Sequence, residues 1–191
     1  MTRQSRLNPV VNAGDLPWVS VGIFGAVPNA REITISVTSG QASFTSPEAL
    51  SSWVGKTICV RGAGVGGANL VTTITSAVSG ASATLTTTPS TTAASTTAVV
   101  GTDSTAAFQT ALNALQPGGV LEIPAPLREG EGDSYLITDT LATTTPNITL
   151  RGSGATFGAN GSRILFAPLT GRPLLVHGTD SGNAYDSNEY D

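Results

Sequence analysis

GTDSTAAFQTALNALQPGGVLEIP, residues 101–124, contains the one helix that the sequence predicts, followed at once by a strand. Apolar residues recur along residues 104–115 at a spacing of three or four, which places them on one stripe of a helix. The residues of this stripe are Phe108, Ala111, Leu112 and Leu115. Asp103 is placed to act as the N-cap, and a Pro-Gly-Gly sequence ends the helix. A single stripe buries one face, so we expect Phe108, Leu112 and Leu115 to pack against an apolar surface.

Short strands follow this helix, separated by polar turns. Their sequences are GGVLEIP, SYLITDTL, NITLRGSG, SRILFAPL and PLLVHGT, within residues 118–179. Since no helices lie between them, these strands are not βαβ units. They form either antiparallel hairpins or the coils of a parallel β-helix. We expect Asn147 to tie a turn through its side chain, and Gly152 and Gly154 to form a β corner.

Residues 31–100 predict a separate set of short strands before the helix. In REITISVTS, Ile33, Ile35 and Val37 alternate with polar residues, which is typical of a strand with one buried face. Residues 86–97 are almost entirely Thr, Ser, Ala and Pro, a composition that also occurs in linkers. The apolar pattern resumes directly afterwards, which favours an exposed edge strand and a loop.

RGAGVGGANL, residues 61–70, holds Gly62, Gly64 and Gly67 at the G-x-G-x-x-G spacing of dinucleotide-binding proteins. That fingerprint requires a helix opening within the glycines and an acidic residue about 20 positions later. Here β-branched residues typical of a strand follow, and residues 82–92 contain no Asp or Glu. The sequence therefore predicts β corners at Gly62 and Gly64, and no bound nucleotide or other cofactor.

The composition narrows the function classes. Charged residues make up 12% of the 191 residues, against about a quarter in an average domain. The net charge of −4 and the scattered basic residues argue against nucleic acid as a partner. No apolar run is long enough for a membrane span or a secretory signal. We therefore expect no membrane partner, no signal peptide, and assembly in a cytoplasm.

Cys59 is the single cysteine, so the chain has no internal disulfide, and we expect Cys59 to act as a small buried apolar residue. Whether it meets His177, the single histidine, is left open by the sequence. Trp18 and Trp53 are predicted to be packing anchors. Aromatic residues could instead line a sugar site, but at 5% of the chain they do not support a dedicated platform. The residues considered for such a site are Trp18, Tyr135, Tyr185 and Tyr190.

Glu129, Glu131 and Asp133 lie close together in a Gly-rich stretch, which favours a solvated turn. A calcium site is the alternative for these oxygen ligands. The acidic residues near the C-terminus predict a polar tail; they are Asp180, Asp186, Glu189 and Asp191. No set of acids has the paired arrangement of a glycan hydrolase. The sequence thus predicts neither catalytic nor metal-binding residues.

Five segments, taken in order, resemble the opening of pectate-lyase-like right-handed parallel β-helix proteins, and more narrowly that of bacteriophage tailspikes and tail fibres. The segments are VGIFGAV (21–27), GTDSTAAFQTALNAL (101–115), GGVLEIP (118–124), SYLIT (134–138) and NITLRGSGA (147–155). The resemblance implies that the helix at 104–115 caps the first coil of a right-handed parallel β-helix. It also implies a parallel homotrimer.

The chain departs from the family pattern in three places, one of which is the longer segment from Pro124 to Tyr135 that replaces the family's P-P-G-x-Y turn. About seventy residues, 28–100, separate segments that are adjacent in the family, and Ser104 replaces the second Asp of its turn motif. The fold class we expect is therefore mainly β, in four parts. These are an extended arm (1–17), a strand leading into the β-helix cap (18–27), an inserted β-sandwich or barrel serving as a neck or spacer (28–100), and the capping helix with the start of the β-helix (101–191).

The function that this resemblance implies is structural. We expect the N-terminal, virion-attachment part of a phage tailspike or tail fibre, located in the virion tail, whose arm docks onto a tail or baseplate protein. It would anchor a receptor-binding module for adsorption to the host, with bacterial surface polysaccharide bound further along the protein. Two alternatives stay open: a polysaccharide depolymerase whose catalytic β-helix lies beyond residue 191, and a glycan-binding module within residues 28–100.

Overall fold

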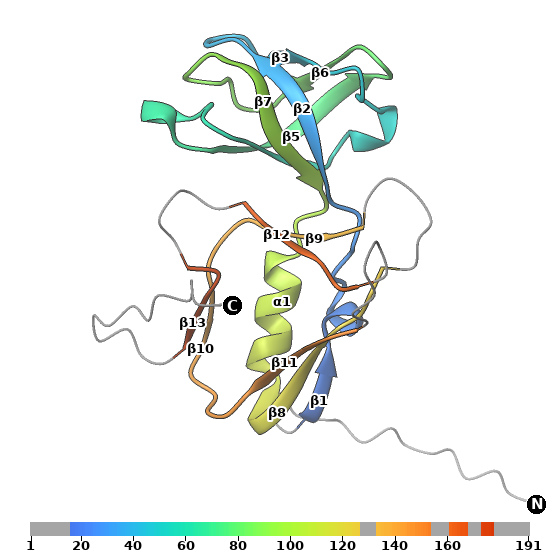
Figure 1. The fold of residues 1–191 in the computed structure, drawn as a ribbon, viewed down its shortest axis with the longest axis vertical. Helices are drawn as coiled ribbons and strands as arrows, with labels where there is room; N and C mark the ends of the chain where they lie inside the picture. The colour runs from blue at the N-terminus through green and yellow to red at the C-terminus, as the bar shows by residue number, and fades with distance from the viewer. Residues whose placement is uncertain (1–15, 127–132, 154–160, 168–172, 178–191) are drawn as a thin grey trace, which may run out of the picture.

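The structure is a computed structural model that describes residues 16–126, 133–153, 161–167 and 173–177. These residues are mainly β, as the sequence predicts, and contain one α-helix. Figure 1 shows two parts: a β-barrel, coloured blue to green, and three small sheets arranged around the helix. Within the described ranges, no helix has the length and apolarity to cross a membrane.

A closed antiparallel barrel occupies the middle of the sequence, so the barrel is the observed form of the predicted β-sandwich or barrel. Its strands are β2 (Arg31–Val37), β3 (Ser43–Thr45), β4 (Thr57–Val60), β5 (Leu70–Val78), β6 (Ser82–Leu85) and β7 (Ala93–Gly101). Around the barrel the order is β2-β3-β6-β5-β4-β7. Two short 3-10 helices, η2 (Ser51–Trp53) and η3 (Val65–Gly67), lie in its connections.

The barrel core is built from the inward residues of each strand, because successive side chains of a strand point to opposite faces. Ile33, Ile35 and Val37 of β2 are buried there, which matches the alternation in the sequence. Trp53, a predicted packing anchor, is also buried in this core. The Arg31 guanidinium lies 5.2 Å from the centre of the Trp53 ring and 3.2 Å from Glu48 Oε2.

The sequence predicts an exposed edge strand and a loop in residues 86–97. The loop is confirmed and ends at Thr92, but the strand that follows, β7, is not an edge strand along its whole length. β7 pairs with β2 on one side and with β4 on the other. β4 pairs only with residues 98–101, where Ala98 and Val100 face the core. The Ser- and Thr-rich residues 93–97 pair with β2 alone and keep exposed or partly exposed side chains.

The predicted strand at 18–27 is wrong beyond Ser20. β1 (Leu16–Ser20) is followed by the 3-10 helix η1 (Val21–Phe24), which Gly25 ends at a φ of +87°. Trp18 is 47% exposed and is not a packing anchor. Val19 points into the core, so Trp18, its neighbour on the strand, points outward. Residues 1–15 of the predicted arm lie outside the described residues.

The helix α1 (Thr105–Asn113) is shorter than predicted. Leu115 is not on its apolar face but is the first residue of β8 (Leu115–Ile123), where it pairs with Leu16 of β1. It is still buried in the same core as α1. The helical spacing of Leu115 therefore indicates correctly that the residue is buried. It does not indicate the backbone conformation, because Leu115 pairs with β1 as part of a strand.

Three parallel sheets surround α1. The remaining strands are β9 (Tyr135–Ile137), β10 (Leu141–Thr143), β11 (Thr149–Gly152), β12 (Ile164–Phe166) and β13 (Leu175–His177). β8 pairs with β1 and β11, β9 with β12, and β10 with β13, all in parallel. Of the two arrangements predicted here, antiparallel hairpins are therefore excluded for these pairs.

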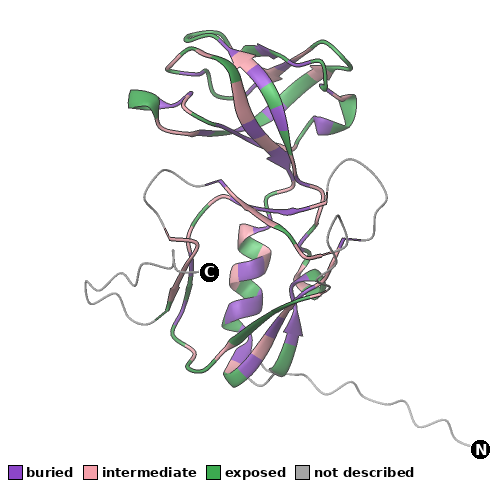
Figure 2. Cartoon of the chain, in the orientation of Figure 1, coloured by how far each residue is buried: buried purple, intermediate pink, exposed green. Residues whose placement is uncertain are grey.

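The core of this second part lies between α1 and the sheets, as the buried residues in Figure 2 show. Phe108 and Leu112 of α1 are fully buried. The Phe108 ring meets Tyr135 edge to face, with the ring centres 5.4 Å apart. The helix thus packs on its predicted stripe, apart from Leu115.

Candidate functional site at the junction of the barrel and the parallel strands

Two chain segments connect the barrel to the sheets around α1, and they are bonded to each other. The Asn29 and Thr102 pair exchanges two hydrogen bonds: Asn29 Nδ2 donates to Thr102 Oγ1 (3.0 Å), and Thr102 N donates to Asn29 Oδ1 (2.8 Å). Lys56 Nζ of the barrel also donates to Thr102 Oγ1 (2.8 Å). Ala30 N donates to Ser134 O (2.8 Å), just before β9. The junction therefore consists of paired backbone rather than a free linker.

Gly101 allows the two segments to cross closely. A Cβ at this position would lie 2.6 Å from both Cα and Cβ of Ala30, closer than real Cβ atoms approach other atoms. Since these neighbours belong to the main chain or sit directly on it, they have no rotamer with which to move away.

Cys59 lies in the interface between the two parts. It belongs to β4 but points away from the barrel core, and it packs with Ala30, Leu136 and Ala167. Its Sγ lies 3.1 Å from Ala167 O, to which the thiol donates. Burial raises the pKa of the thiol from 9.0 to about 11, and Arg61 offsets part of that rise. The prediction that Cys59 is a small buried residue in apolar surroundings is confirmed.

His177 has other neighbours. It is exposed on β13, with Nε2 3.0 Å from Thr145 O. Cys59 and His177 therefore do not form a catalytic pair, which answers the question that the sequence left open.

We predict that Cys59 is protected from alkylation in the folded chain. At mildly alkaline pH, iodoacetamide should react with it about a hundredfold more slowly than in urea, because the raised pKa lowers the thiolate fraction by that factor. The free energy of unfolding should also fall as the pH rises above 9.0, since the unfolded chain loses this proton first. Mass spectrometry of the alkylated protein gives both rates, and equal rates would contradict the buried position.

The outer edges of β8, β9 and β10 are each covered by an earlier segment. β1 pairs with β8. Asp103 bridges to Leu136, and Ser104 N donates to Leu136 O (2.8 Å) on β9. The side-chain amide of Gln109 on α1 accepts a hydrogen bond from Ala142 N (2.9 Å) and donates one to Ala142 O (2.7 Å). It thus bonds the backbone of β10 in the way that a neighbouring strand would. β1, residues 103–104 and Gln109 thus cover one end of the three sheets.

Asp103 contributes to this closure, although it is not the N-cap. Ser104 holds the N-cap position and makes no side-chain cap bond. Asp103 Oδ1 accepts from Thr105 N (2.9 Å) and Thr105 Oγ1 (2.6 Å), while Oδ2 accepts from Thr138 Oγ1 (2.5 Å). The Asp103 carboxylate therefore caps the helix from the residue before the N-cap position, and it also links the helix to Thr138 at the end of β9.

We predict that Asp103→Ala lowers the free energy of unfolding by about 1 kcal/mol, the usual cost of losing a side-chain cap. Asp103→Asn is the matched variant, because it keeps an acceptor for Thr105 N and should retain most of that stability. Urea titration of both variants measures the difference. Equal midpoints for the wild type and Asp103→Ala would contradict the role of this carboxylate.

The predicted glycine corners differ from one another. Gly62 has a φ of +72°, a left-handed conformation that suits a corner. Gly64 is needed for close approach instead, because a Cβ there would lie 2.9 Å from the carbonyl oxygens of Ala68 and Asn69. Gly152 ends β11 without a positive φ, so it is not a left-handed corner. Gly154 lies outside the described residues.

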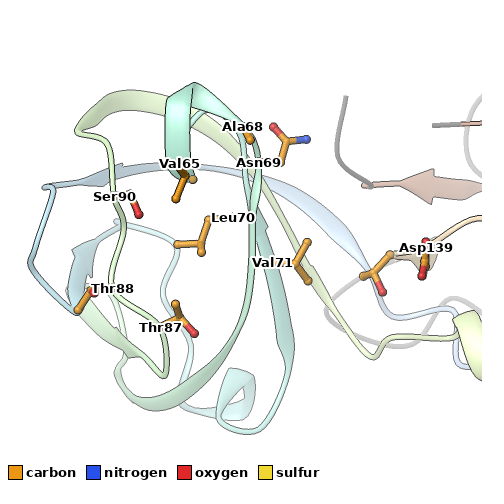
Figure 3. Close-up of a pocket in the computed structure, with 11 residues that line it drawn as sticks. Val65, Ala68, Asn69, Leu70, Val71, Thr87, Thr88, Ser90 and Asp139 are labelled. Carbon is orange, nitrogen blue, oxygen red and sulfur yellow. The ribbon is translucent and has the colours of Figure 1, made fainter. Parts of the chain in front are cut away.

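A groove beside these glycines is the candidate binding site. It has a volume of about 510 Å³ and spans both parts of the molecule, as Figure 3 shows. The lining residues are Gly64, Val65, Ala68, Asn69, Leu70, Val71, Thr87, Thr88, Ser90, Thr138 and Asp139. In the view of Figure 3, Leu70 points toward Thr87 and Ser90, whereas Val71 points toward Asp139.

The groove combines an apolar surface with hydroxyl, amide and carboxylate groups. This suits non-covalent binding of a small polar molecule. It does not suit a dinucleotide, because η3 has only three residues and β5 follows it, so no long helix N-terminus faces the groove. The sequence predicts the turn at these glycines but not the groove, which needs residues 138–139 to complete it.

The other predicted candidates do not join this site. Asp133 forms an ion pair with Arg163 at 2.9 Å. Tyr135 is buried, with its hydroxyl donating to Pro124 O (3.1 Å), so it does not line a sugar site. Among the described residues, no group of three His, Cys, Asp or Glu could hold a metal. Glu129, Glu131, Tyr185, Tyr190 and the four C-terminal acids lie outside them.

No family model, no curated protein and no solved structure matches the chain.

Proposed function

We propose that the chain is the N-terminal, virion-proximal part of a phage tailspike or tail fibre, in which the barrel is inserted at the start of a right-handed parallel β-helix. The observation that carries this proposal is the order of strand pairing. Val120 of β8 pairs with Thr149, 29 residues later, and Tyr135 of β9 pairs with Ile164, also 29 residues later. Leu141 of β10 pairs with Leu175, 34 residues later. A solenoid with three strands per coil produces such repeated parallel pairing.

The different states of the two ends also support the proposal. The first three strands have their outer edges covered by β1, the Asp103 segment and Gln109. In the second set of strands, β11, β12 and β13, the apolar residues are less buried than their partners in the first set. Leu121 of β8 is fully buried, whereas its partner Leu150 of β11 is 45% exposed. Ile164 and Phe166 are likewise only partly buried. A cap at one end and an apolar template at the other suit the start of a longer stack.

The barrel fits the role of a neck or spacer. It lies beside β9 and β12 in Figure 1 and is held by the paired segments at Asn29 and Thr102. Its surface carries many Ser and Thr residues and few charges, which suits contact with neighbouring subunits because charges are costly to bury. In this proposal residues 1–17 dock onto a tail or baseplate protein, and three copies associate side by side.

Native mass spectrometry of the full chain tests the oligomeric part of the proposal. We expect a homotrimer that stays trimeric when residues 1–15 are removed, because the arm serves attachment. The shortened trimer should then fail to bind purified tails of the phage that encodes it. A folded monomer at every concentration, or undiminished tail binding without the arm, would contradict the proposal. The depolymerase alternative places its chemistry after Asp191 and stays a prediction.

A further inference from the structure

We infer that the folded barrel acts as a template for the parallel strands: it forms before them, and its contacts fix the register of β9 and β12. This folding role goes beyond the proposed attachment role and does not depend on it, because it rests only on contacts within one chain. Parallel pairing between distant strands is slow, since the chain between them must be ordered before stabilising contacts form. An earlier structure that already holds these strands in place lowers that barrier.

The barrel has what it needs to form first. Its core is one cluster of buried residues, with Ile35, Phe44 and Ile74 among them, and of the described residues it includes none from α1 or the parallel strands. Three of its pairings join strands that are consecutive in the chain: β2 with β3, β4 with β5 and β5 with β6. The described parallel pairs join more distant strands, namely β8 with β11, β9 with β12 and β10 with β13. Because near pairings form faster than distant ones, the barrel is the part that folds first.

Closure of the barrel brings its two ends together. Arg31 at the start of β2 pairs with Val100 near the end of β7. Gly101 passes so close to Ala30 that a Cβ on it would lie 2.6 Å from Ala30 Cα. The folded barrel therefore joins the two segments that lead out of it, which are about seventy residues apart in the chain. The entropy of closing that loop is lost when the barrel folds, so the strands around α1 do not lose it again.

Both segments that leave the barrel bond to the chain at β9. Ala30 N donates to Ser134 O (2.8 Å), and Ala30 O accepts from Ser134 N (3.2 Å), just before the strand. Ser104 N donates to Leu136 O (2.8 Å), and Asp103 forms a parallel bridge with Leu136. A slip of one residue would turn every side chain of β9 to the opposite face. These backbone bonds therefore set which side chains of β9 face the barrel.

The outer surface of the barrel extends this contact to the second strand of the same sheet. Cys59 of β4 and Val99 of β7 are strand partners and point away from the barrel core. They belong to one apolar cluster with Leu136 of β9 and with Leu165 of β12, the strand partner of Leu136. The Cys59 thiol also donates to Ala167 O (3.1 Å), directly after β12. One surface of the barrel, which we call the template surface and define by Cys59 and Val99, is thus packed against both strands.

β9 and β12 are short enough to need such support. Each strand has three residues, and the two form a sheet of their own. Isolated pairs of short strands are at best marginally stable in water. If the core around α1 formed first, this pair would have to keep its register before the barrel surface and the barrel ends were in place.

The test follows refolding of the full chain from urea by pulsed hydrogen exchange, with mass spectrometry of peptides that cover each strand. We expect β2, β5 and β7 to gain protection first, and residues 135–137 and 164–166 to gain it together in a later step. Both rates should be independent of chain concentration, because the contacts lie within one chain and not between subunits. Protection of residues 135–137 before the barrel, or at the same rate as the barrel, would overturn the inference.

A variant of the template surface separates a folding role from a merely structural one. Cys59→Ala combined with Val99→Ala trims this surface and leaves the residues of the barrel core in place. The barrel should gain protection at the wild-type rate. Residues 135–137 and 164–166 should gain it at least about fivefold more slowly, while the unfolding rate changes by less than about twofold. A variant that folds as fast as the wild type and only unfolds faster would show that the contact forms last, which would overturn the inference.

Two single variants complete the test. Val99→Ala alone should show the same division between the folding and unfolding rates at a smaller size, and it keeps the test decisive where the double variant fails to fold. Val78→Ala is the matched control, because it removes the same two methyl groups from a residue that is 63% exposed on β5 and lies outside the cluster around Cys59. It should leave all of these rates unchanged. Equal slowing of β9 and β12 in Val78→Ala would overturn the assignment of the template to this surface.

Discussion

Gly101→Val should lower the free energy of unfolding by at least about 3 kcal/mol, the upper end of what overpacking costs. The new side chain would begin 2.6 Å from Ala30 Cα, at the crossing of the two segments that hold the barrel. Relief requires the segments to separate, which also breaks the bond between Ala30 N and Ser134 O. Chemical denaturation with circular dichroism measures the loss, and hydrogen exchange should show it first at residues 28–30 and 101–104.

Gly22→Ala is the control for this substitution. A Cβ at Gly22 would meet Ser20 Oγ at 3.7 Å, an ordinary contact, and the backbone there has no positive φ. Its effect should stay within about 0.5 kcal/mol. If Gly101→Val were as stable as Gly22→Ala, the two segments could not cross as closely as described.

Phe108→Ala should cost about 3–5 kcal/mol, because it removes a fully buried aromatic side chain from the core around α1. The substitution also removes the edge-to-face contact with Tyr135. The barrel has its own apolar core, which does not include Phe108. We therefore expect the sheets around α1 to lose protection from hydrogen exchange while the barrel, including Trp53, keeps most of its own.

Thr110→Ala on the same helix is the matched control, since Thr110 is exposed and donates only to Ala106 O within the helix. It should change stability by less than about 0.5 kcal/mol. Loss of protection in the barrel and the α1 core together after Phe108→Ala would show that the two cores unfold as one unit, contrary to the expectation.

The features predicted best from sequence are those with a local period. Ile33, Ile35 and Val37 alternate on β2, and Phe108 and Leu112 share one face of α1, so each pattern directly reports which side is buried. Leu115 shows the limit of this reasoning, because a buried residue just after a helix keeps the helical spacing while its backbone joins β8.

Features that depend on distant residues were predicted poorly. Closure of the barrel gives residues 98–101 of β7 a second neighbour, β4, which no local pattern in the sequence indicates. Trp18 is large and apolar, yet the direction of its side chain follows from the register with Val120. The groove likewise joins the glycine loop to Asp139, about seventy residues away, and no local pattern marks that meeting.

The central claim is that this chain begins the β-helix of a virion tail protein, and cryo-electron microscopy of intact tails tests it most directly. The account predicts three copies around a threefold axis, with each barrel on the side of the tail and the strands β11, β12 and β13 continuing into further coils away from it. Tails that lack the chain, or that hold it as single copies with the barrel facing away from the particle, would contradict the account.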